Sequence, residues 1–175
     1  MPRKILVIGA GKSSFYLFDY LLSKAHEEDL ELTIGDIRPE NIPVSIACHP
    51  HSNVLKLDIS KEAERKNAIS NETNVASMLP ASLHIKIAKD CLQYGKHLVT
   101  ASYVSPELKV LDKKVKAAGL IFMNEIGLDP GIDHMSAMQI IDGIREKGGK
   151  IILFESFCGG LVAPESDNNL WNYKF

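Results

Sequence analysis

Two kinds of pattern alternate along the chain. Short continuous runs of aliphatic and β-branched residues are typical of strands buried on both faces of a parallel sheet. Such runs occupy residues 4–9, 30–37, 53–59, 74–80, 96–101 and 120–125. Polar or amphipathic stretches of helical length lie between them, at residues 13–25, 60–69, 81–95 and 105–119. This alternation of strand and helix predicts an α/β fold built on a doubly wound parallel sheet.

Residues at the ends of these stretches suggest where the helices begin and end. Ser60 and Ser105 are predicted N-caps, because a serine hydroxyl can accept a hydrogen bond from the first helical turn. Pro106 suits the first helical position, where its missing N–H costs nothing. Gly95 and Gly119 are predicted to end the helices that precede them.

The pattern changes after Glu125. Residues 126–134 read as a loop rich in glycine and proline, and Asp133 is predicted to cap a helix that runs to about Lys147. Residues 148–160 predict one more strand, and the remaining stretch has little periodicity. A helix and a strand are too little for a second domain. We therefore expect one complete domain at residues 1–130 and the beginning of an incomplete domain at residues 131–175.

Composition limits the partners and the compartment. The 175 residues carry a formal net charge of −2, so no polyanion footprint is present and no nucleic-acid partner is expected. Cys48, Cys91 and Cys158 form no paired framework, which favours free thiols and a cytoplasmic location. The apolar N-terminal run leads into glycines without a cleavage site, and no run is long enough for a membrane helix.

The segment IGAGKSSF, which starts at Ile8, contains two glycines of a dinucleotide-binding fingerprint and a serine in place of the third. It follows a predicted buried strand and precedes a predicted helix, where such a turn can hold a pyrophosphate against free N–H groups. The predicted coenzyme contacts of this turn are Gly9, Gly11, Lys12, Ser13 and Ser14. The alternative is a tight turn in an α/β domain that binds no nucleotide.

Asp36 and Arg38 bear on the choice of coenzyme. An acid at the end of the second strand accepts hydrogen bonds from a ribose 2′-hydroxyl, which weakly favours NAD over NADP. Arg38 could instead pair with a 2′-phosphate, or be an exposed loop cation. Further coenzyme contacts are predicted where other strands end, at Asp58, Ile59, Leu79, Pro80, Thr100, Ser102 and Leu128. His84, in the same region, reads as a surface or capping histidine rather than a catalyst.

Other chemistries have little support in the sequence. The stretch CHPH at residues 48–51 holds metal-ligand types, but no second cluster matches it, and no metal is expected. No GxSxG segment indicates a serine hydrolase.

Three longer segments, TASYVSPE from Thr100, NEIGLDPGIDH from Asn124 and FCGGLVAPESDNNLWNYKF from Phe157, resemble the saccharopine dehydrogenase family. The resemblance extends over essentially the whole chain. It implies a Rossmann-type coenzyme domain followed by the start of a second α/β domain that holds substrate. Two departures stand out: relatives commonly end the second strand in a Cys-Arg pair where this chain has GDIR, and they continue for hundreds of residues with further substrate contacts.

The resemblance also implies roles for single residues. Asp129, Tyr103 and Cys158 become the proton-handling candidates, and Ser102, Tyr103 and Asp129 the substrate contacts. From the residues alone, each has a plainer interpretation: Asp129 as a turn residue before Pro130, Tyr103 as loop packing, Cys158 as a buried thiol and Ser102 as a turn cap.

The function implied by the resemblance is an NAD(P)-dependent oxidoreductase of lysine metabolism. It would interconvert saccharopine with L-glutamate and 2-aminoadipate 6-semialdehyde, so the expected partner is a small amino-acid substrate, with a homodimer as a possible assembly. One alternative is a carboxynorspermidine-type imine reductase. The other is a nucleotide-binding fragment without turnover.

Overall fold

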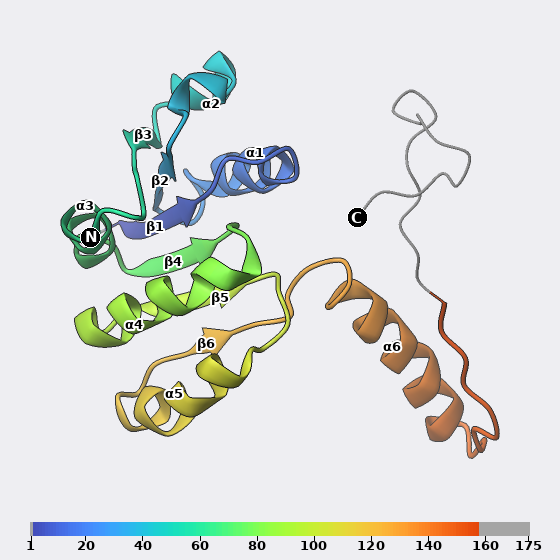
Figure 1. Ribbon diagram of the computed structural model, residues 1–175. Helices are drawn as coiled ribbons and strands as arrows, with labels where there is room; N and C mark the ends of the chain where they lie inside the picture. Colours follow the sequence, from blue (N-terminus) through green and yellow to red (C-terminus); the bar gives the residue numbers. More distant parts are fainter. Residues whose placement is uncertain (1, 158–175) are drawn as a thin grey trace, which may run out of the picture. The chain divides into compact units, whose positions relative to one another are not determined.

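The computed structural model describes residues 2–157 (Figure 1). The chain divides into two compact units, Met1–Met135 and Ser136–Phe175. The first unit contains the whole sheet, and helix α6 (Ile132–Glu146) starts in the first unit and continues into the second.

The sheet has six strands, and every neighbouring pair is parallel. In chain order they are β1 (Arg3–Ile8), β2 (Leu30–Asp36), β3 (Ser52–Lys56), β4 (Asn74–Ser77), β5 (His97–Thr100) and β6 (Phe122–Met123). Their order across the sheet is β3-β2-β1-β4-β5-β6. The chain therefore builds outward from β1 in one direction and then in the other, which confirms the predicted doubly wound sheet.

Helices connect successive strands. The α-helices of the first unit are α1 (Ser14–Lys24), α2 (Val44–Ala47), α3 (Glu62–Ser70), α4 (His84–Tyr94) and α5 (Pro106–Ala117). Two short 3₁₀ turns, η1 (Pro39–Asn41) and η2 (Ala81–Leu83), precede α2 and α4. Within residues 2–157, no helix has both the length and the apolar composition needed to cross a lipid bilayer.

The core consists of two apolar layers, one on each face of the sheet. Because side chains alternate along a strand, Leu6 and Ile8 of β1 face one layer and Val7 faces the other. The first layer packs β1 and β4 against α3, α4 and α5, and the second packs β1 and β2 against α1 and α2. Leu6, Val7 and Ile8 are buried against these two layers, which explains the continuous aliphatic sequence at this end of β1.

A buried ion pair joins α3 to α4 at the first layer. Arg65 Nε lies 2.5 Å from Asp90 Oδ2, and the two side chains are 10% and 5% exposed. Arg65 Nη1 also donates to the carbonyl oxygen of Ile59 at 2.7 Å. Such a pair contributes little net stability relative to an apolar pair, but either charge left alone in this place is strongly unfavourable.

Some predicted helix ends are confirmed and others are wrong. The Ser105 hydroxyl accepts a hydrogen bond from the Leu108 N–H at 3.2 Å, as an N-cap should. Ser60 is not an N-cap: α3 starts two residues later, because the Asp58 carboxylate accepts from both the Ser60 N–H and its hydroxyl and folds that segment into a turn. Asp133 lies inside α6, and its carboxylate accepts from the Gly131 N–H.

The strand predicted at residues 148–160 is also wrong as far as the structure describes it. Residues 150–157 form neither helix nor strand, and Ile152 and Phe157 are 92% and 89% exposed. The sequence has strand composition, but a strand needs a partner to receive its hydrogen bonds. Within residues 2–157, no other strand pairs with it.

Candidate coenzyme and substrate site

The site lies between β1 and β4, where the direction in which the chain adds strands to the sheet reverses. In open parallel sheets this switch point leaves a crevice at the carboxyl ends of the strands, and ligands bind there. Gly9 follows β1 at this point with φ +106°, and a Cβ on Gly9 would lie 3.0 Å from the Met78 carbonyl oxygen after β4. A side chain would thus clash with the neighbouring backbone, so the turn requires glycine at this position.

The rest of the turn brings bare main chain to the start of α1. A Cβ on Gly11 would meet nothing within 4 Å, so the space beside this backbone is open. The buried Ser14 hydroxyl donates to the Gly9 carbonyl at 3.0 Å, and the Ser14 N–H donates to the Gly11 carbonyl at 2.9 Å. Ser14 therefore ties the helix to the turn, as a third glycine does by close packing. Lys12 and Ser13 are exposed.

Asp36 connects the end of β2 to the same turn. Its Oδ2 accepts from the Ala10 N–H and its Oδ1 accepts from the Arg38 N–H, both at 2.7 Å. Each carboxylate oxygen has a second lone pair, so Asp36 can also accept from a ligand hydroxyl. The Arg38 side chain is exposed.

The remaining predicted coenzyme contacts lie along the same edge at different depths. Lys56 pairs with Asp36 in the sheet, so Asp58 follows β3 close to the end of β2. Hydrogen bonds from Ser60 lower the pKa of Asp58 and keep it charged. Ile59 and Leu79 are half-buried and pack against the first core layer, Pro80 leads into η2, and Leu128 is 76% exposed.

Loops after β5 and β6 carry the predicted substrate groups. Tyr103 Oη donates to Asp129 Oδ1 at 2.8 Å, so the structure brings two of the three proton-handling candidates together. The buried Thr100 hydroxyl donates to Asn124 Oδ1 at 3.2 Å. Tyr103 is 59% exposed, which leaves the pair open to a ligand. Cys158, the third candidate, lies outside the described residues.

Two glycines explain why these loops approach each other. A Cβ on Gly127 would lie 3.0 Å from the Ala101 carbonyl oxygen, so a larger residue would push the loop after β6 away from the loop after β5. At Gly131, with φ +150°, a Cβ would overlap the backbone of Gly127. The Gly127 N–H donates to the Pro130 carbonyl at 2.8 Å, so the loop closes on itself and Asp129 lies near its tip.

His84 differs from its sequence interpretation. It is 2% exposed, at the first residue of α4, instead of lying on the helix surface. Its Nδ1 lies 2.9 Å from Ser77 Oγ and its Nε2 lies 2.9 Å from Ser102 Oγ. Burial lowers the pKa of His84. The signal that could have indicated this was the position of SMLPASLH directly after a buried strand, between two serines at strand ends.

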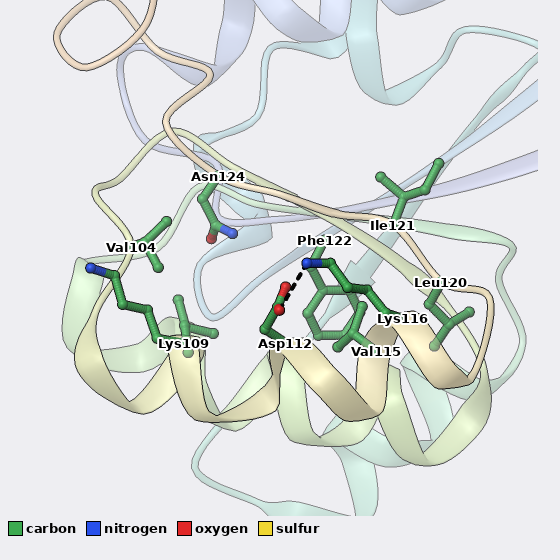
Figure 2. A pocket seen from close by; sticks show the side chains of 10 residues that line it. Val104, Lys109, Asp112, Val115, Lys116, Leu120, Ile121, Phe122 and Asn124 are labelled. Carbon is green, nitrogen blue, oxygen red and sulfur yellow. Dashed lines mark hydrogen bonds and ion pairs between the residues drawn. The ribbon is translucent and has the colours of Figure 1, made fainter.

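A separate pocket lies between α5 and β6. It has a volume of about 510 Å³ and is lined mainly by apolar side chains, including Leu108, Val115, Leu120 and Phe122 (Figure 2). The Lys116–Asp112 ion pair, 2.9 Å long, lies on α5 beside it. The pocket is distinct from the coenzyme crevice at the switch point, because its lining includes none of Gly9, Gly11, Asp36, Tyr103 and Asp129. Among residues 2–157, no cluster of three or more His, Cys, Asp or Glu side chains could hold a metal ion.

Taken together, the strand order, the glycine turn at the switch point and Asp36 at the end of β2 define a Rossmann-type dinucleotide-binding domain. Comparison with protein-family models agrees with this class. The saccharopine dehydrogenase NADP binding domain matches residues 5–123, and the saccharopine dehydrogenase C-terminal domain matches residues 127–175. The chain belongs to the saccharopine dehydrogenase family, and its coenzyme type is NAD(P).

Individual relatives support the assignment. The chain is 37% identical over 175 residues to "Saccharopine dehydrogenase [NADP(+), L-glutamate-forming]" of Schizosaccharomyces pombe, covering all of this chain and 38% of the relative. It is 38% identical over 174 residues to the bovine "Alpha-aminoadipic semialdehyde synthase, mitochondrial", of which it covers 18%. The solved apo saccharopine dehydrogenase (L-Glu forming) of Saccharomyces cerevisiae superimposes with a TM-score of 0.82 at 34% identity, over 99% of this chain and 38% of that one.

Proposed function

We propose that this chain forms the coenzyme-binding part and the start of the substrate part of an NAD(P)-dependent oxidoreductase of lysine metabolism. The reaction interconverts saccharopine with L-glutamate and 2-aminoadipate 6-semialdehyde. The observation that carries the proposal is the hydrogen bond between Tyr103 and Asp129 at the same sheet edge as the glycine turn. Because the chain spans 38% of the fission yeast relative, the activity of the whole enzyme is part of the proposal.

The residues present fit a dinucleotide. The open main chain at Gly11 and the N-terminus of α1 would accommodate a pyrophosphate, and Asp36 would accept hydrogen bonds from a ribose. A bound nicotinamide would supply or take up the hydride. This chain's own groups would handle the protons that C–N bond chemistry requires, at the substrate nitrogen and at the attacking water. Tyr103 and Asp129, already hydrogen-bonded and open to a ligand, suit that role, and Cys158 remains a third candidate.

Coenzyme preference is a second part of the proposal. The Asp36 carboxylate lies where it would accept from a 2′-hydroxyl and repel a 2′-phosphate, which favours NAD(H). The family model and the fungal relative are named for NADP, and they do not support this preference. Exposed Arg38 is the cation on this chain that a 2′-phosphate could recruit. Asp36→Ser removes the repulsion, and Asp36→Asn keeps an acceptor without the charge.

Titration of the chain with NADH and NADPH tests both parts. We expect binding of both coenzymes, tighter for NADH, and a relative gain for NADPH of about tenfold in Asp36→Ser, equivalent to 1.4 kcal/mol. The Asn variant should lie between wild type and Ser. Tighter wild-type binding of NADPH would refute the preference for NAD, and no binding of either coenzyme would refute the function.

The activity is tested next, with saccharopine and the better oxidised coenzyme. Turnover that falls at least about tenfold in both Tyr103→Phe and Asp129→Asn, with coenzyme affinity unchanged, supports proton handling by this pair. Turnover equal to that of the wild type in both variants contradicts this role. Coenzyme binding with no turnover of either saccharopine or carboxynorspermidine would favour a nucleotide-binding fragment. The chain covers 38% of the fission yeast relative, which makes this the second candidate.

The domain roles, assembly and location remain proposals. We assign coenzyme binding to residues 1–130 and the start of a substrate or dimerisation domain to residues 131–175. Exposed apolar side chains at Ile152, Leu153 and Phe157 support association into a homodimer, which light scattering after size-exclusion chromatography would test. A cytoplasmic location is supported by the free thiols of Cys48 and Cys91, although the bovine relative is named mitochondrial.

A further inference from the structure

Three side chains form a continuous hydrogen-bonded row at the carboxyl edge of the sheet. Ser77 ends β4, His84 begins α4 and Ser102 follows β5. The imidazole bridges the two hydroxyls, with 2.9 Å from Nδ1 to Ser77 Oγ and 2.9 Å from Nε2 to Ser102 Oγ. In the sheet, Ser77 lies between Ile8 of β1 and Thr100 of β5, so the row starts beside the switch point and ends at the loop that carries Tyr103.

Burial decides which ring nitrogen carries the proton. Ser77 is fully buried, and within residues 2–157 its hydroxyl has one hydrogen-bond partner, His84 Nδ1. If Nδ1 carried a proton, the Ser77 O–H would have no acceptor, at a cost of about 1–3 kcal/mol. The Ser77 hydroxyl therefore donates to Nδ1, and a neutral imidazole then carries its proton on Nε2.

The surroundings keep the ring neutral. His84 is almost completely enclosed, and burial lowers the pKa of its imidazole. It is also the first residue of α4, where the positive end of the helix dipole disfavours an imidazolium. The neutral ring has one donor and one acceptor, so fixing the Ser77 end also fixes the Ser102 end.

With the proton on Nε2, Ser102 accepts a hydrogen bond from His84. The Ser102 O–H must then donate to a different acceptor. Among the described residues, the half-buried Ser102 hydroxyl has no hydrogen-bond partner other than His84. The loop is held in place, because the Glu125 N–H donates to the Ser102 carbonyl at 3.0 Å. A fixed hydroxyl with a free proton at this edge is a donor for a ligand.

We propose that His84 is a positioning residue that makes the Ser102 hydroxyl a hydrogen-bond donor to an acceptor oxygen of the bound ligand. This inference rests on the proposed function. Two ligand groups share the required chemistry: the carboxamide oxygen of a nicotinamide and a carboxylate oxygen of the amino-acid substrate. The experiments below distinguish them.

The first experiment measures the tautomer without any ligand. Nitrogen-15 NMR of the 175-residue chain, with the His84 signals assigned by their loss in His84→Gln, reports which ring nitrogen is protonated at neutral pH. We expect a protonated Nε2 and an unprotonated Nδ1. Protonation of Nδ1, alone or together with Nε2, would overturn the inference.

The second experiment measures binding by His84→Leu, His84→Gln, Ser102→Ala and the double variant His84→Leu/Ser102→Ala. Loss of one hydrogen bond should weaken ligand binding by about threefold to tenfold in the Leu and Ala variants. The double variant should be no weaker than Ser102→Ala, because both changes remove the same contact. His84→Gln, whose side-chain amide N–H can replace Nε2–H, should retain affinity. Thermal unfolding of each variant separates lost contacts from lost folding.

The choice of ligand identifies the acceptor. If the acceptor is the carboxamide, the variants lose affinity for NAD(P)H and no longer discriminate against the thionicotinamide analogue, in which sulfur replaces that oxygen. If it is the substrate carboxylate, coenzyme affinity stays constant and binding of saccharopine weakens in the same variants. Unchanged binding of both ligands overturns the inference alone. A wild-type chain that binds neither coenzyme refutes the proposed function, and the NMR result still decides the arrangement of His84 and Ser102.

Discussion

Gly9→Ala should lower the stability of the fold, whereas Gly11→Ala should lower the affinity for the coenzyme, although the two glycines are only two residues apart. At Gly9 the backbone has φ +106°, and an added Cβ would lie 3.0 Å from the carbonyl oxygen and 3.1 Å from the carbonyl carbon of Met78. Met78 cannot easily move away, because its N–H donates to the Ile8 carbonyl at 2.8 Å. At Gly11 the φ is not in the left-handed range and an added Cβ would contact nothing.

These geometries give the magnitudes. A residue other than glycine at a strained positive φ costs about 1–3 kcal/mol. We therefore expect Gly9→Ala to lower the free energy of unfolding by at least that much, with the contact to Met78 adding to it. Gly11→Ala should change stability by less than about 0.5 kcal/mol, as surface substitutions usually do. Its methyl group would instead occupy the space where a pyrophosphate approaches the main chain, so coenzyme affinity should fall by about tenfold or more, at least 1.4 kcal/mol.

Urea unfolding followed by far-ultraviolet circular dichroism measures the stabilities, and fluorescence titration with NADH measures the affinities. Gly11→Ala is its own folding control, since its unfolding curve should overlay that of the wild type. A Gly11→Ala variant that binds NADH as tightly as wild type would show that no pyrophosphate lies against this turn. A Gly9→Ala variant of wild-type stability would show that the turn does not pack against Met78 as described.

The buried ion pair, the thiols and the buried imidazole give three more predictions. Asp90→Leu leaves Arg65 buried without its partner and should lower the free energy of unfolding by about 3–5 kcal/mol, while Arg65→Met/Asp90→Leu recovers most of the loss; a single variant as stable as wild type contradicts this. Burial raises the pKa of the Cys91 thiol to about 12, so iodoacetamide at pH 8 should label exposed Cys48 and spare Cys91 in peptide mapping, and equal labelling would be inconsistent with the fold. Burial lowers the pKa of His84 below its usual 6.5. As the pH falls, His84 is therefore protonated in the unfolded chain before it is protonated in the folded chain, and stability should decline below about pH 6.5. That decline should be smaller in His84→Gln, and identical pH profiles would rule out the contribution.

Features governed by neighbouring residues were predictable from the sequence. The Ser105 cap and Pro106 at the start of α5 depend on contacts within one helical turn, and both are as predicted. The buried strands were also readable, because a strand covered on both faces has a continuous apolar sequence. The alternation of strands and helices predicted a doubly wound parallel sheet, and the structure adds the strand order β3-β2-β1-β4-β5-β6.

Features that depend on distant residues were not predictable in this way. The position of His84 after a buried strand hints at burial, but its pairing with Ser77 and Ser102 could not be predicted, because the three meet only when β4, α4 and β5 assemble. The same limit explains the error at residues 148–160, whose strand composition meets no pairing strand in the described part of the chain. At Ser60, a side chain with cap chemistry was bound by Asp58 instead, two residues earlier.

Because β1 lies between β2 and β4 in the sheet, its two neighbours are synthesised at very different times. β2 is complete at Asp36, whereas β4 is complete only at Ser77. At about 5–20 residues per second, the ribosome needs roughly 2–8 seconds to add the intervening stretch. For that interval the apolar end of β1, residues 5–8, has one unpaired edge in the nascent chain, and an edge of this kind is what chaperones protect during translation.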